Sequence, residues 1–330
     1  MIVTLTLNPS LDRTVEIGEL ARGAVIRAGS ARLDPGGKGV NVTRALIANQ
    51  IPSKAVLPCG GDEGYQLAGL LHAEGVEVIA VPITAHTRSN VALAEADGTI
   101  TKINEPGARL TPHELDALTE AVQAAAGRAG WVAACGSLPP GVPVDFYADL
   151  CRRCADQGVK VAVDTSGPAL LAAVEARPAL IKPNRDELAA AVGSKIETVQ
   201  DVVDAAQALR SWGAQAVLAS LGADGAVLVT DAGAIAGEAR VAAPRSSVGA
   251  GDALLAGFLA AGAAGTAGAA STHDDASAHD DASALAEALA WASAAVSLPG
   301  SRMPACADIR RDLAVIHSGP DLSRPLVTPR

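Results

Sequence analysis

The feature that most constrains this chain is a regular alternation of apolar, strand-like runs with amphipathic helical patterns. The alternation begins near residue 38 and continues through most of the 330 residues. After a first strand at 2–7, strands are predicted at 54–59, 78–81, 130–135, 160–164, 178–182 and 215–219. Helices are predicted at 38–49, 63–74, 112–127, 144–157, 185–192 and 199–211. This succession indicates right-handed βαβ units and therefore an α/β fold with a mostly parallel central sheet.

Composition fits such a core and limits the class of partner. Hydrophobic residues make up 49% of the chain but aromatic residues only 2%, so Ala, Val, Leu and Ile must fill the interior. The net charge is −10, and an acidic surface argues against nucleic acid as a partner. No apolar run reaches the roughly 18 residues of a membrane helix, and the start MIVTLTLNPSLD lacks the basic region of a signal peptide. We therefore expect small-molecule partners, with no nucleic acid and no membrane.

Cysteine usage indicates a reducing compartment. The five cysteines are Cys59, Cys135, Cys151, Cys154 and Cys306. Their number is odd, and one lies in an apolar strand-like run, so free thiols in the cytoplasm are the simple interpretation. The CxxC pair lies within a helical pattern and has no second pair at zinc-like spacing, which makes it incidental; redox or metal use is the alternative.

Two segments break the βαβ rhythm. Residues 12–34 contain strand-like pieces with no helix between them, and residues 88–104 form two alternating runs around a turn at Asp97-Gly98. Together they predict a small antiparallel sheet that projects from a single domain spanning 1–330. One apolar face of such a sheet needs a cover, which a substrate or a second copy of the chain would supply.

The C-terminal part contains a low-complexity stretch at 262–284, in which HDDASA occurs twice in tandem. Its small residues predict a flexible surface loop. Its His and Asp side chains leave a divalent metal as a weaker alternative, because a loop of this kind offers no fixed coordination geometry. The final residues, SGPDLSRPLVTPR, are predicted to form a poorly ordered tail.

The sharpest chemical signal is the segment SSVGAGDALLAGFLA at 246–260. Gly249, Ala250 and Gly251 form a tight turn before a helix that begins beside Asp252. Amides at a helix N-terminus bind anions, and the helix dipole favours negative charge there. The Asp252 carboxylate could accept a proton from an attacking hydroxyl, although an Asp at a helix start is also a common capping residue.

Three further segments accompany this motif. PGGKGVN at 35–41 combines glycines for close approach with the cation of Lys38, although it lacks the P-loop spacing and could be only a tight turn. SLGADG at 220–225 could contact a nucleotide or simply join two strands. In IKPNRDE at 181–187, Asn184 and Glu187 match a capping box, and a water-mediated Mg²⁺ contact is the alternative.

These segments resemble the ribokinase-like PfkB carbohydrate kinase family. TLNPSLD, PGGKGVN, TRSNVAL, GSLPPG, KPNRDE, SLGADG and SSVGAGD occur in the family's order, and the resemblance extends to the helix around 285–297. It implies a three-layer ribokinase-like fold, a β lid, and phosphoryl transfer from ATP with Mg²⁺.

The resemblance also implies residue roles. Asp252 is similar to the family's catalytic base, and the backbone of Gly249, Ala250 and Gly251 to its anion hole. The implied sugar-phosphate residues are Asp12, Gly36, Gly37, Lys38, Asn41, Arg88 and Ser137. The implied nucleotide residues are Lys182, Asn184, Ser220, Gly222 and Gly225, with Asn184 and Glu187 organising Mg²⁺ through water.

Within the family, GGKG and TRSNV are most similar to 1-phosphofructokinase and tagatose-6-phosphate kinase, and of the two we favour 1-phosphofructokinase. This implies phosphorylation of fructose 1-phosphate to fructose 1,6-bisphosphate in the cytoplasm, with a homodimer formed through the lid. Tagatose-6-phosphate kinase and 6-phosphofructokinase are the alternatives; the latter type tends to have glycine where Lys38 stands. A nucleoside or neutral-sugar kinase would not need Lys38 together with Arg88, and a non-catalytic sugar-phosphate sensor would not need Asp252.

Overall fold

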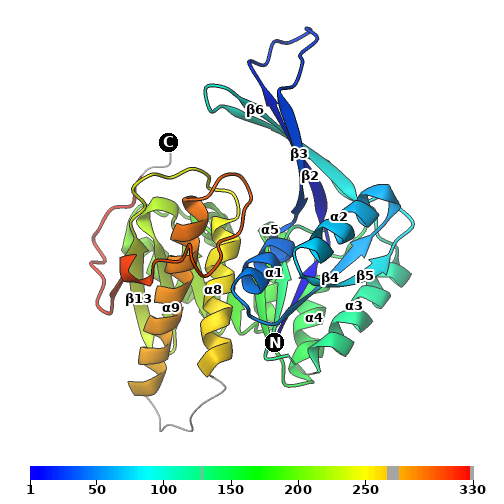
Figure 1. Ribbon diagram of the computed structural model, residues 1–330. Coiled ribbons are helices and arrows are strands. Elements are labelled where there is room, and N and C mark those ends of the chain that lie inside the picture. Colours follow the sequence, from blue (N-terminus) through cyan, green and yellow to red (C-terminus); the bar gives the residue numbers. More distant parts are fainter. Residues whose placement is uncertain (128, 266–274, 328–330) are drawn as a thin grey trace.

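The computed structural model describes residues 1–127, 129–265 and 275–327. A ten-stranded sheet forms the central layer of the molecule (Figure 1). Seven strands run parallel: β11 (Val217–Ser220), β10 (Leu180–Ile181), β9 (Lys160–Asp164), β8 (Trp131–Cys135), β1 (Ile2–Thr6), β4 (Ser53–Cys59) and β5 (Glu77–Pro82). At one edge, β12 (Ala226–Thr230), β13 (Gly233–Ala239) and β14 (Ala314–His317) continue the sheet in antiparallel pairs. The predicted mostly parallel α/β fold is confirmed.

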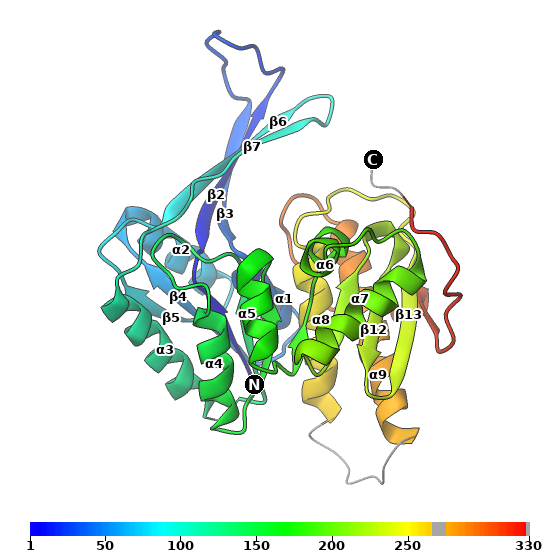
Figure 2. The same cartoon turned by 180° about the vertical axis from the view of Figure 1, so that it is seen from behind.

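Helices cover both faces of this sheet (Figures 1 and 2). One face carries α1 (Lys38–Ala48), α2 (Gly61–Ala73), α8 (Ala250–Gly265) and α9 (Asp275–Val296). The other carries α3 (Pro112–Ala126), α4 (Phe146–Ala155), α5 (Gly167–Glu175), α6 (Arg185–Val192) and α7 (Val199–Trp212). Short 3₁₀ turns lie at η1 (Gly222–Asp224) and η2 (Arg311–Leu313). The helix at 167–175 was not predicted from the sequence.

Small residues let the helices on the first face approach one another closely. A Cβ at Gly257 of α8 would lie 2.9 Å from the Cα of Ala288 in α9. Around this contact, Leu255, Leu289 and Trp291 are buried in the same hydrophobic cluster. The Ala- and Gly-rich composition therefore serves close helix packing in a core with few aromatic residues.

A second sheet projects from the body beside α1 (Figure 1). Its strands are β3 (Ser30–Gly36), β2 (Ser10–Ile17), β6 (Arg88–Glu95) and β7 (Ile100–Ile103), in that order. The β2–β3 and β6–β7 pairs are antiparallel, whereas β2 and β6 run parallel with Asp12 opposite Asn90. β2 follows β1 in the chain, and β6 follows β5. Both therefore start at the carboxyl ends of parallel strands of the central sheet and extend in the same direction.

The stretch 262–284 differs from its prediction as a loop. Residues 262–265 complete α8, residues 275–284 begin α9, and residues 266–274, which include the first His of the repeat, lie outside the described residues. Ala is the strongest helix former, and Asp at a helix N-terminus is favoured by the helix dipole. Asp281 accepts a hydrogen bond of 2.7 Å from the Thr230 hydroxyl on β12, so this part of α9 is fixed to the sheet.

The C-terminal segment also differs from its prediction as a poorly ordered tail. Residues 322–326 run beside the start of α7, where the Val199 N–H donates to the Arg324 carbonyl at 3.1 Å. The Leu326 N–H donates to the Glu197 carbonyl at 2.8 Å, and the Leu326 side chain is buried. One apolar side chain, several backbone hydrogen bonds and an ion pair between Arg324 and Asp224 thus dock the segment.

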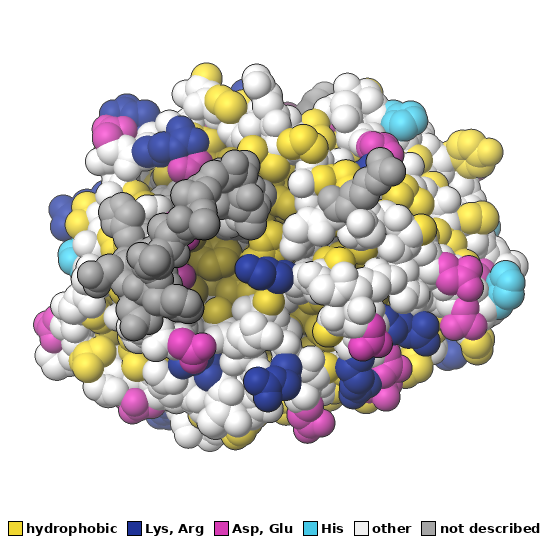
Figure 3. Space-filling view, turned by 90° about the horizontal axis from the view of Figure 1, so that it is seen from below, with side chains coloured by type: hydrophobic (Ala, Val, Ile, Leu, Met, Phe, Trp, Pro, Cys, Tyr) yellow, Lys and Arg dark blue, Asp and Glu magenta, His cyan; other side chains and the backbone are white. Residues whose placement is uncertain are grey.

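Charges of both signs share one face of the molecule, and no disulfide bond links the described cysteines. On the face shown in Figure 3, Lys and Arg side chains are interspersed with Asp and Glu, within the part of the chain that is described. No described helix has both the length and the apolar content needed to cross a bilayer. All five cysteines are free, and burial raises the pKa of Cys151 to about 12 and that of Cys154 to about 11, so the CxxC pair remains as thiols.

Candidate active site

The predicted anion-binding turn lies at the start of α8. Gly249 has φ 78°, and a Cβ there would lie 2.5 Å from Met303 Cε, so both the backbone and the space require glycine. The Ala253 N–H donates to the Gly249 carbonyl at 2.8 Å and begins the helix. The N–H groups of the first turn have no acceptor within the helix and are available to an anion. Of these, Ala250 makes only a long contact of 3.4 Å to the Ser247 carbonyl.

Asp252 lies in this first turn and is buried, with 8% of its surface exposed. Asn41 Nδ2 donates to Asp252 Oδ2 at 2.8 Å. Burial, together with the charge of Asp164, raises the pKa of Asp252 to about 6; Asn41, Lys182 and Lys38 oppose this rise. The carboxylate can therefore release and accept a proton close to neutral pH, which a general base needs.

Two lysines and a second aspartate surround Asp252. Asp164, at the end of β9, is fully buried; Lys38 Nζ lies 2.7 Å from its Oδ1 and Lys182 Nζ 3.1 Å from its Oδ2. Burial alone would raise the pKa of Asp164, but the two lysine charges keep it below its ordinary value. We call Asp252, Asn41, Asp164, Lys38 and Lys182 the base cluster.

The base cluster keeps positive charge next to the anion turn. Burial tends to lower the pKa of Lys38, but the charges of Asp164 and Glu187 outweigh it and raise that pKa above its ordinary value. A Cβ at Gly251 would lie 3.4 Å from Lys182 Nζ, so this ammonium group adjoins the turn. A negatively charged group at the turn would meet amides on one side and an ammonium on the other.

The predicted nucleotide residues lie together at the ends of β10 and β11. The backbones of Asn184 and Ser220 form an isolated parallel β-bridge. In the turn around η1, the Leu221 N–H donates to the Gly225 carbonyl at 2.8 Å. Asn184 and Glu187 form a capping box for α6, with reciprocal hydrogen bonds of 2.8 and 2.9 Å. The other carboxylate oxygen of Glu187 lies 3.4 Å from Lys38 Nζ. Capping therefore occurs, and it leaves Glu187 beside the base cluster.

On the lid side, Asp12 is fixed at the base of β2. Its Oδ1 accepts hydrogen bonds from the Ser10 hydroxyl at 2.6 Å and from Asn90 Nδ2 at 2.9 Å. Gly36 lies opposite Ser10, and a Cβ there would collide with the Asp12 carboxylate. Gly37 has φ 120°, and a Cβ there would lie 2.8 Å from Thr6 Cγ2. The two glycines thus let the chain turn from β3 into α1 directly beside Asp12.

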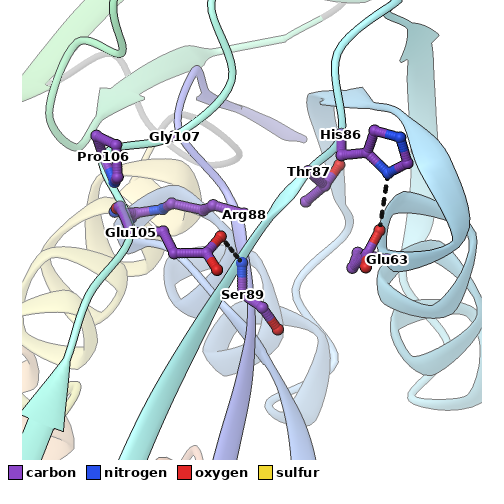
Figure 4. Close-up of a pocket in the computed structure, with 8 residues that line it drawn as sticks. All are labelled: Glu63, His86, Thr87, Arg88, Ser89, Glu105, Pro106 and Gly107. Carbon is purple, nitrogen blue, oxygen red and sulfur yellow. Dashed lines mark hydrogen bonds and ion pairs between the residues drawn. The ribbon is translucent and has the colours of Figure 1, made fainter.

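Arg88 lies in a separate cavity of about 350 Å³ at the base of the lid (Figure 4). Figure 4 shows Glu105 and Pro106 on one side of its side chain and His86, paired with Glu63, on the other. Arg88 donates to the backbone carbonyls of Glu105 at 3.1 Å and Asn8 at 3.0 Å. Its Nε is buried without a hydrogen-bond partner among the described residues. Burial lowers the pKa of Arg88, against the nearby charges of Asp12 and Glu105.

Ser137 adjoins the Arg88 cavity through Asn8, whose Nδ2 donates to the Ser137 hydroxyl at 3.2 Å. The predicted site residues therefore form two groups. Lys38, Asn41, Lys182, Glu187 and Asp252 surround the anion turn; Asp12, Arg88 and Ser137 lie at the base of the lid, and Gly36 and Gly37 join the two.

Comparisons with known proteins agree with this arrangement. A family model described as pfkB family carbohydrate kinase matches residues 5–306. The chain belongs to this family. It is 36% identical over 260 residues to the 1-phosphofructokinase of Bacillus subtilis, covering 79% of this chain and 85% of that protein. It is 40% identical over 262 residues to the 1-phosphofructokinase of Haloferax volcanii, covering 79% and 84%. The structure of phosphofructokinase-2 from Escherichia coli superposes with a TM-score of 0.84 at 32% identity, covering 93% and 96%.

In this pfkB-family kinase, sequence analysis missed one central residue, Asp164. It lies outside the quoted motifs and is the last residue of the apolar run KVAVD. An acid at the carboxyl end of a buried parallel strand was the available signal, because ligands bind at that edge. Asn8 and Asn90 lie within the quoted motifs TLNPSLD and TRSNVAL but were given no role; the structure shows that they contact Ser137 and Asp12.

Proposed function

We propose that this kinase transfers the γ-phosphoryl group of ATP to a phosphosugar, with fructose 1-phosphate as the preferred acceptor and fructose 1,6-bisphosphate as product. The observation that carries this proposal is the buried Asp252 carboxylate, held by Asn41 in the first turn of α8 beside free helix amides. The 1-phosphofructokinases at 36% and 40% identity support this choice of acceptor.

In this mechanism Asp252 takes the proton of the attacking sugar hydroxyl. Its pKa of about 6 makes it ionised at neutral pH without making it too weak a base. The amides around Gly249, Ala250 and Gly251, with Lys182 beside them, stabilise negative charge on the phosphoryl group as it moves. Positioning and charge stabilisation of this kind provide most of the catalysis in phosphoryl transfer.

ATP would lie along the ends of β10 and β11, against Lys182, Asn184, Ser220, Gly222 and Gly225. Among the described residues, no three His, Cys, Asp or Glu side chains are grouped as a metal site. Asn184 Oδ1 and both Glu187 oxygens already have partners, so they suit a water-mediated contact. Mg²⁺ keeps most of its waters and binds ATP phosphates, so these two residues would hold it through water, where it would neutralise phosphate charge.

The acceptor's own phosphate would bind Arg88. Backbone carbonyls orient this guanidinium, and Nη1 and Nη2, which each donate to one carbonyl, each keep a second N–H. Guanidinium and phosphate match in geometry and charge. Lys38 would add a second cation, since its side chain is 35% exposed although it pairs with Asp164. Asp12, Gly37 and Asn41 would receive the sugar hydroxyls.

The lid sheet supports a homodimer as the working state. Alternation places Val15, Leu33, Val91, Leu93 and Ile103 on one face of the sheet, and Ile103 is 58% exposed. An exposed apolar sheet face of this kind is covered in solution by a partner, and a second copy presents the same apolar surface. The free cysteines fit a cytoplasmic location.

A coupled ADP-release assay tests the proposal. ATP is offered with fructose 1-phosphate, fructose 6-phosphate, tagatose 6-phosphate, fructose, ribose and adenosine, and products are identified by ³¹P NMR. We expect the highest kcat/KM with fructose 1-phosphate. A preference for a neutral sugar would contradict the phosphate role of Arg88, and binding of sugar phosphates without ADP release would indicate a sensor.

A further inference from the structure

A buried arginine on α1 contacts the residue that holds the base. Arg44 is only 7% exposed, and its Nη1 lies 3.4 Å from Asn41 Oδ1, one helical turn away. Its Nε and Nη2 donate to the Glu74 carboxylate at 2.6 and 2.8 Å. This residue lies outside every ligand contact assigned above, yet it is one side chain away from Asp252.

Hydrogen-bond chemistry shows what this contact does. A guanidinium has only donors, so the Asn41 atom facing Arg44 must be the amide oxygen. The amide nitrogen must then face Asp252, where Nδ2 donates to Oδ2 at 2.8 Å. Both neighbours of Asn41 thus require the same amide orientation. A donor at Oδ2 makes that oxygen the poorer site for a new proton, and leaves Oδ1 as the better one.

Arg44 also connects the segments that carry the two groups of site residues. Nη1 lies 3.4 Å from the Pro35 carbonyl at the end of β3, directly before Gly36 and Gly37. It lies 3.2 Å from the Ser301 carbonyl, in the loop whose Met303 packs on Gly249. One buried guanidinium therefore joins the lid base, α1 and the loop behind the anion turn.

We propose that Arg44 is a positioning residue: through Asn41 it fixes the Asp252 carboxylate so that Oδ1 receives the proton of the sugar hydroxyl. The proposal rests on the kinase function and on Asp252 as its base. The Glu74 carboxylate balances the arginine's charge, so Arg44 can orient Asn41 without placing an unpaired cation next to the base.

The expected effect appears in kcat and in its pH dependence. Arg44→Met keeps the aliphatic packing but removes all the donors. The Asn41 amide is then free to rotate, and its hydrogen bond to Asp252, which lowers the pKa of that carboxyl, weakens. The other charged or titratable groups near Asp252 are Asp164, Lys182, Lys38 and Cys135, and they are unchanged. We expect kcat to fall about 10-fold, with the acid limb of kcat shifted to higher pH and the KM for ATP nearly unchanged.

A matched control, Asn49, lies at the C-terminal end of the same helix. Asn49 is buried and donates to the Pro304 carbonyl at 2.8 Å, so it also joins α1 to the loop after α9, but none of its hydrogen bonds involves Asn41 or Asp252. Asn49→Ala should lower the melting temperature while leaving the acid limb of kcat in place. Arg44→Lys, which keeps the charge but not the forked geometry, should restore only part of the loss.

The test is a double-mutant cycle on the full chain. kcat and its acid limb are measured for wild type, Arg44→Met, Asn41→Ala and the double variant, with Arg44→Lys and Asn49→Ala alongside. If Arg44 acts through Asn41, adding Arg44→Met to Asn41→Ala changes kcat by less than about two-fold. Full additivity, or an Arg44→Met variant with lower melting temperature but normal kcat and acid limb, would overturn the proposal. Near-normal turnover in Asp252→Asn would instead overturn the base assignment, and with it this inference.

Discussion

The base cluster and the Arg88 cavity solve the same problem, the control of phosphate charge, in different ways. In the base cluster, Asp252, Asp164, Lys38 and Lys182 lie among rigid strands and a helix start, and opposite charges are 2.7 to 3.1 Å apart. Arg88 instead lies at the base of a projecting sheet, where it donates to two backbone carbonyls and has the charges of Asp12 and Glu105 nearby. A fixed arrangement suits groups that must be in place when charge develops, whereas the cavity suits a ligand that enters and leaves. Changes in the cluster should therefore affect kcat, and changes in the cavity should affect KM.

The largest effect should come from Asp252→Asn, which removes the base but keeps the size of the side chain. We expect kcat to fall by at least about 10²-fold, with the KM for ATP changing little, because the amides of the turn remain. Steady-state kinetics with fructose 1-phosphate measures this. Asp201→Asn, which changes a capping carboxylate at the start of α7, is the comparison variant and should keep kcat close to that of wild type. Near-normal turnover in Asp252→Asn would contradict its role as the base.

The same substitution should change how stability depends on pH. A carboxyl whose native pKa is raised from 3.8 to about 6 binds its proton more tightly in the folded than in the unfolded protein. Stability from this group is therefore present at low pH, is lost as the pH rises from about 4 to about 6, and stays constant above that. Asp252→Asn avoids this loss. Its free energy of unfolding should therefore exceed that of wild type by up to about 3 kcal/mol above pH 6, and by much less near pH 4. Urea denaturation across this range tests it; parallel stability curves would contradict the raised pKa.

In the cavity, Arg88→Met should raise the KM for the phosphosugar about 10- to 100-fold, the value of one or two charge-assisted hydrogen bonds. We expect kcat at saturation to stay within a few-fold, because the base cluster is not touched. His86→Ala, at the other wall of the cavity, serves as the control. A fall in kcat without a change in KM would place Arg88 in the chemical step and remove the contrast between the two regions.

The smallest effect is expected for Lys38, which belongs to the base cluster but was predicted to bind the sugar phosphate. Lys38 was predicted to meet the sugar phosphate, yet its ammonium pairs with Asp164 and Glu187. Lys38→Met should therefore both raise the KM for the phosphosugar and lower stability by about 1–2 kcal/mol. This is less than for a fully buried pair, because Lys38 is 35% exposed and Lys182 still faces Asp164. Thermal unfolding and steady-state kinetics of one preparation measure both. A KM effect without loss of stability would assign Lys38 to the substrate side alone.

Much of the fold could be predicted because its signals are local and repeated. The helices at 38–49, 112–127 and 199–211 have clear helical periodicity, and the composition of GAGD marks a helix start. The prediction of a loop at 262–284 was wrong because the local signal there was ambiguous. The low complexity of this stretch suggested a loop, but Ala favours helix, and packing of α9 against α8 and β12 decides the outcome.

The site was less predictable where it depends on tertiary contact. Asp164 has no motif, and its role depends on two lysines that approach from α1 and from the end of β10. In the sequence, Arg44 has no feature that distinguishes it from other helical residues. Its contacts with Asn41, Glu74 and Ser301 are visible only in the structure. Spacing along the chain shows which residues can share a helix face, but not which segments meet across the sheet.

The pH dependence of kcat with saturating fructose 1-phosphate and ATP tests whether the buried Asp252 is the general base. Wild type should show an acid limb with an apparent pKa near 6, set by the buried Asp252, and the residual activity of Asp252→Asn should lack this limb. An acid limb near pH 4 in wild type would contradict the raised pKa of Asp252, and an unchanged limb in Asp252→Asn would show that another group accepts the proton.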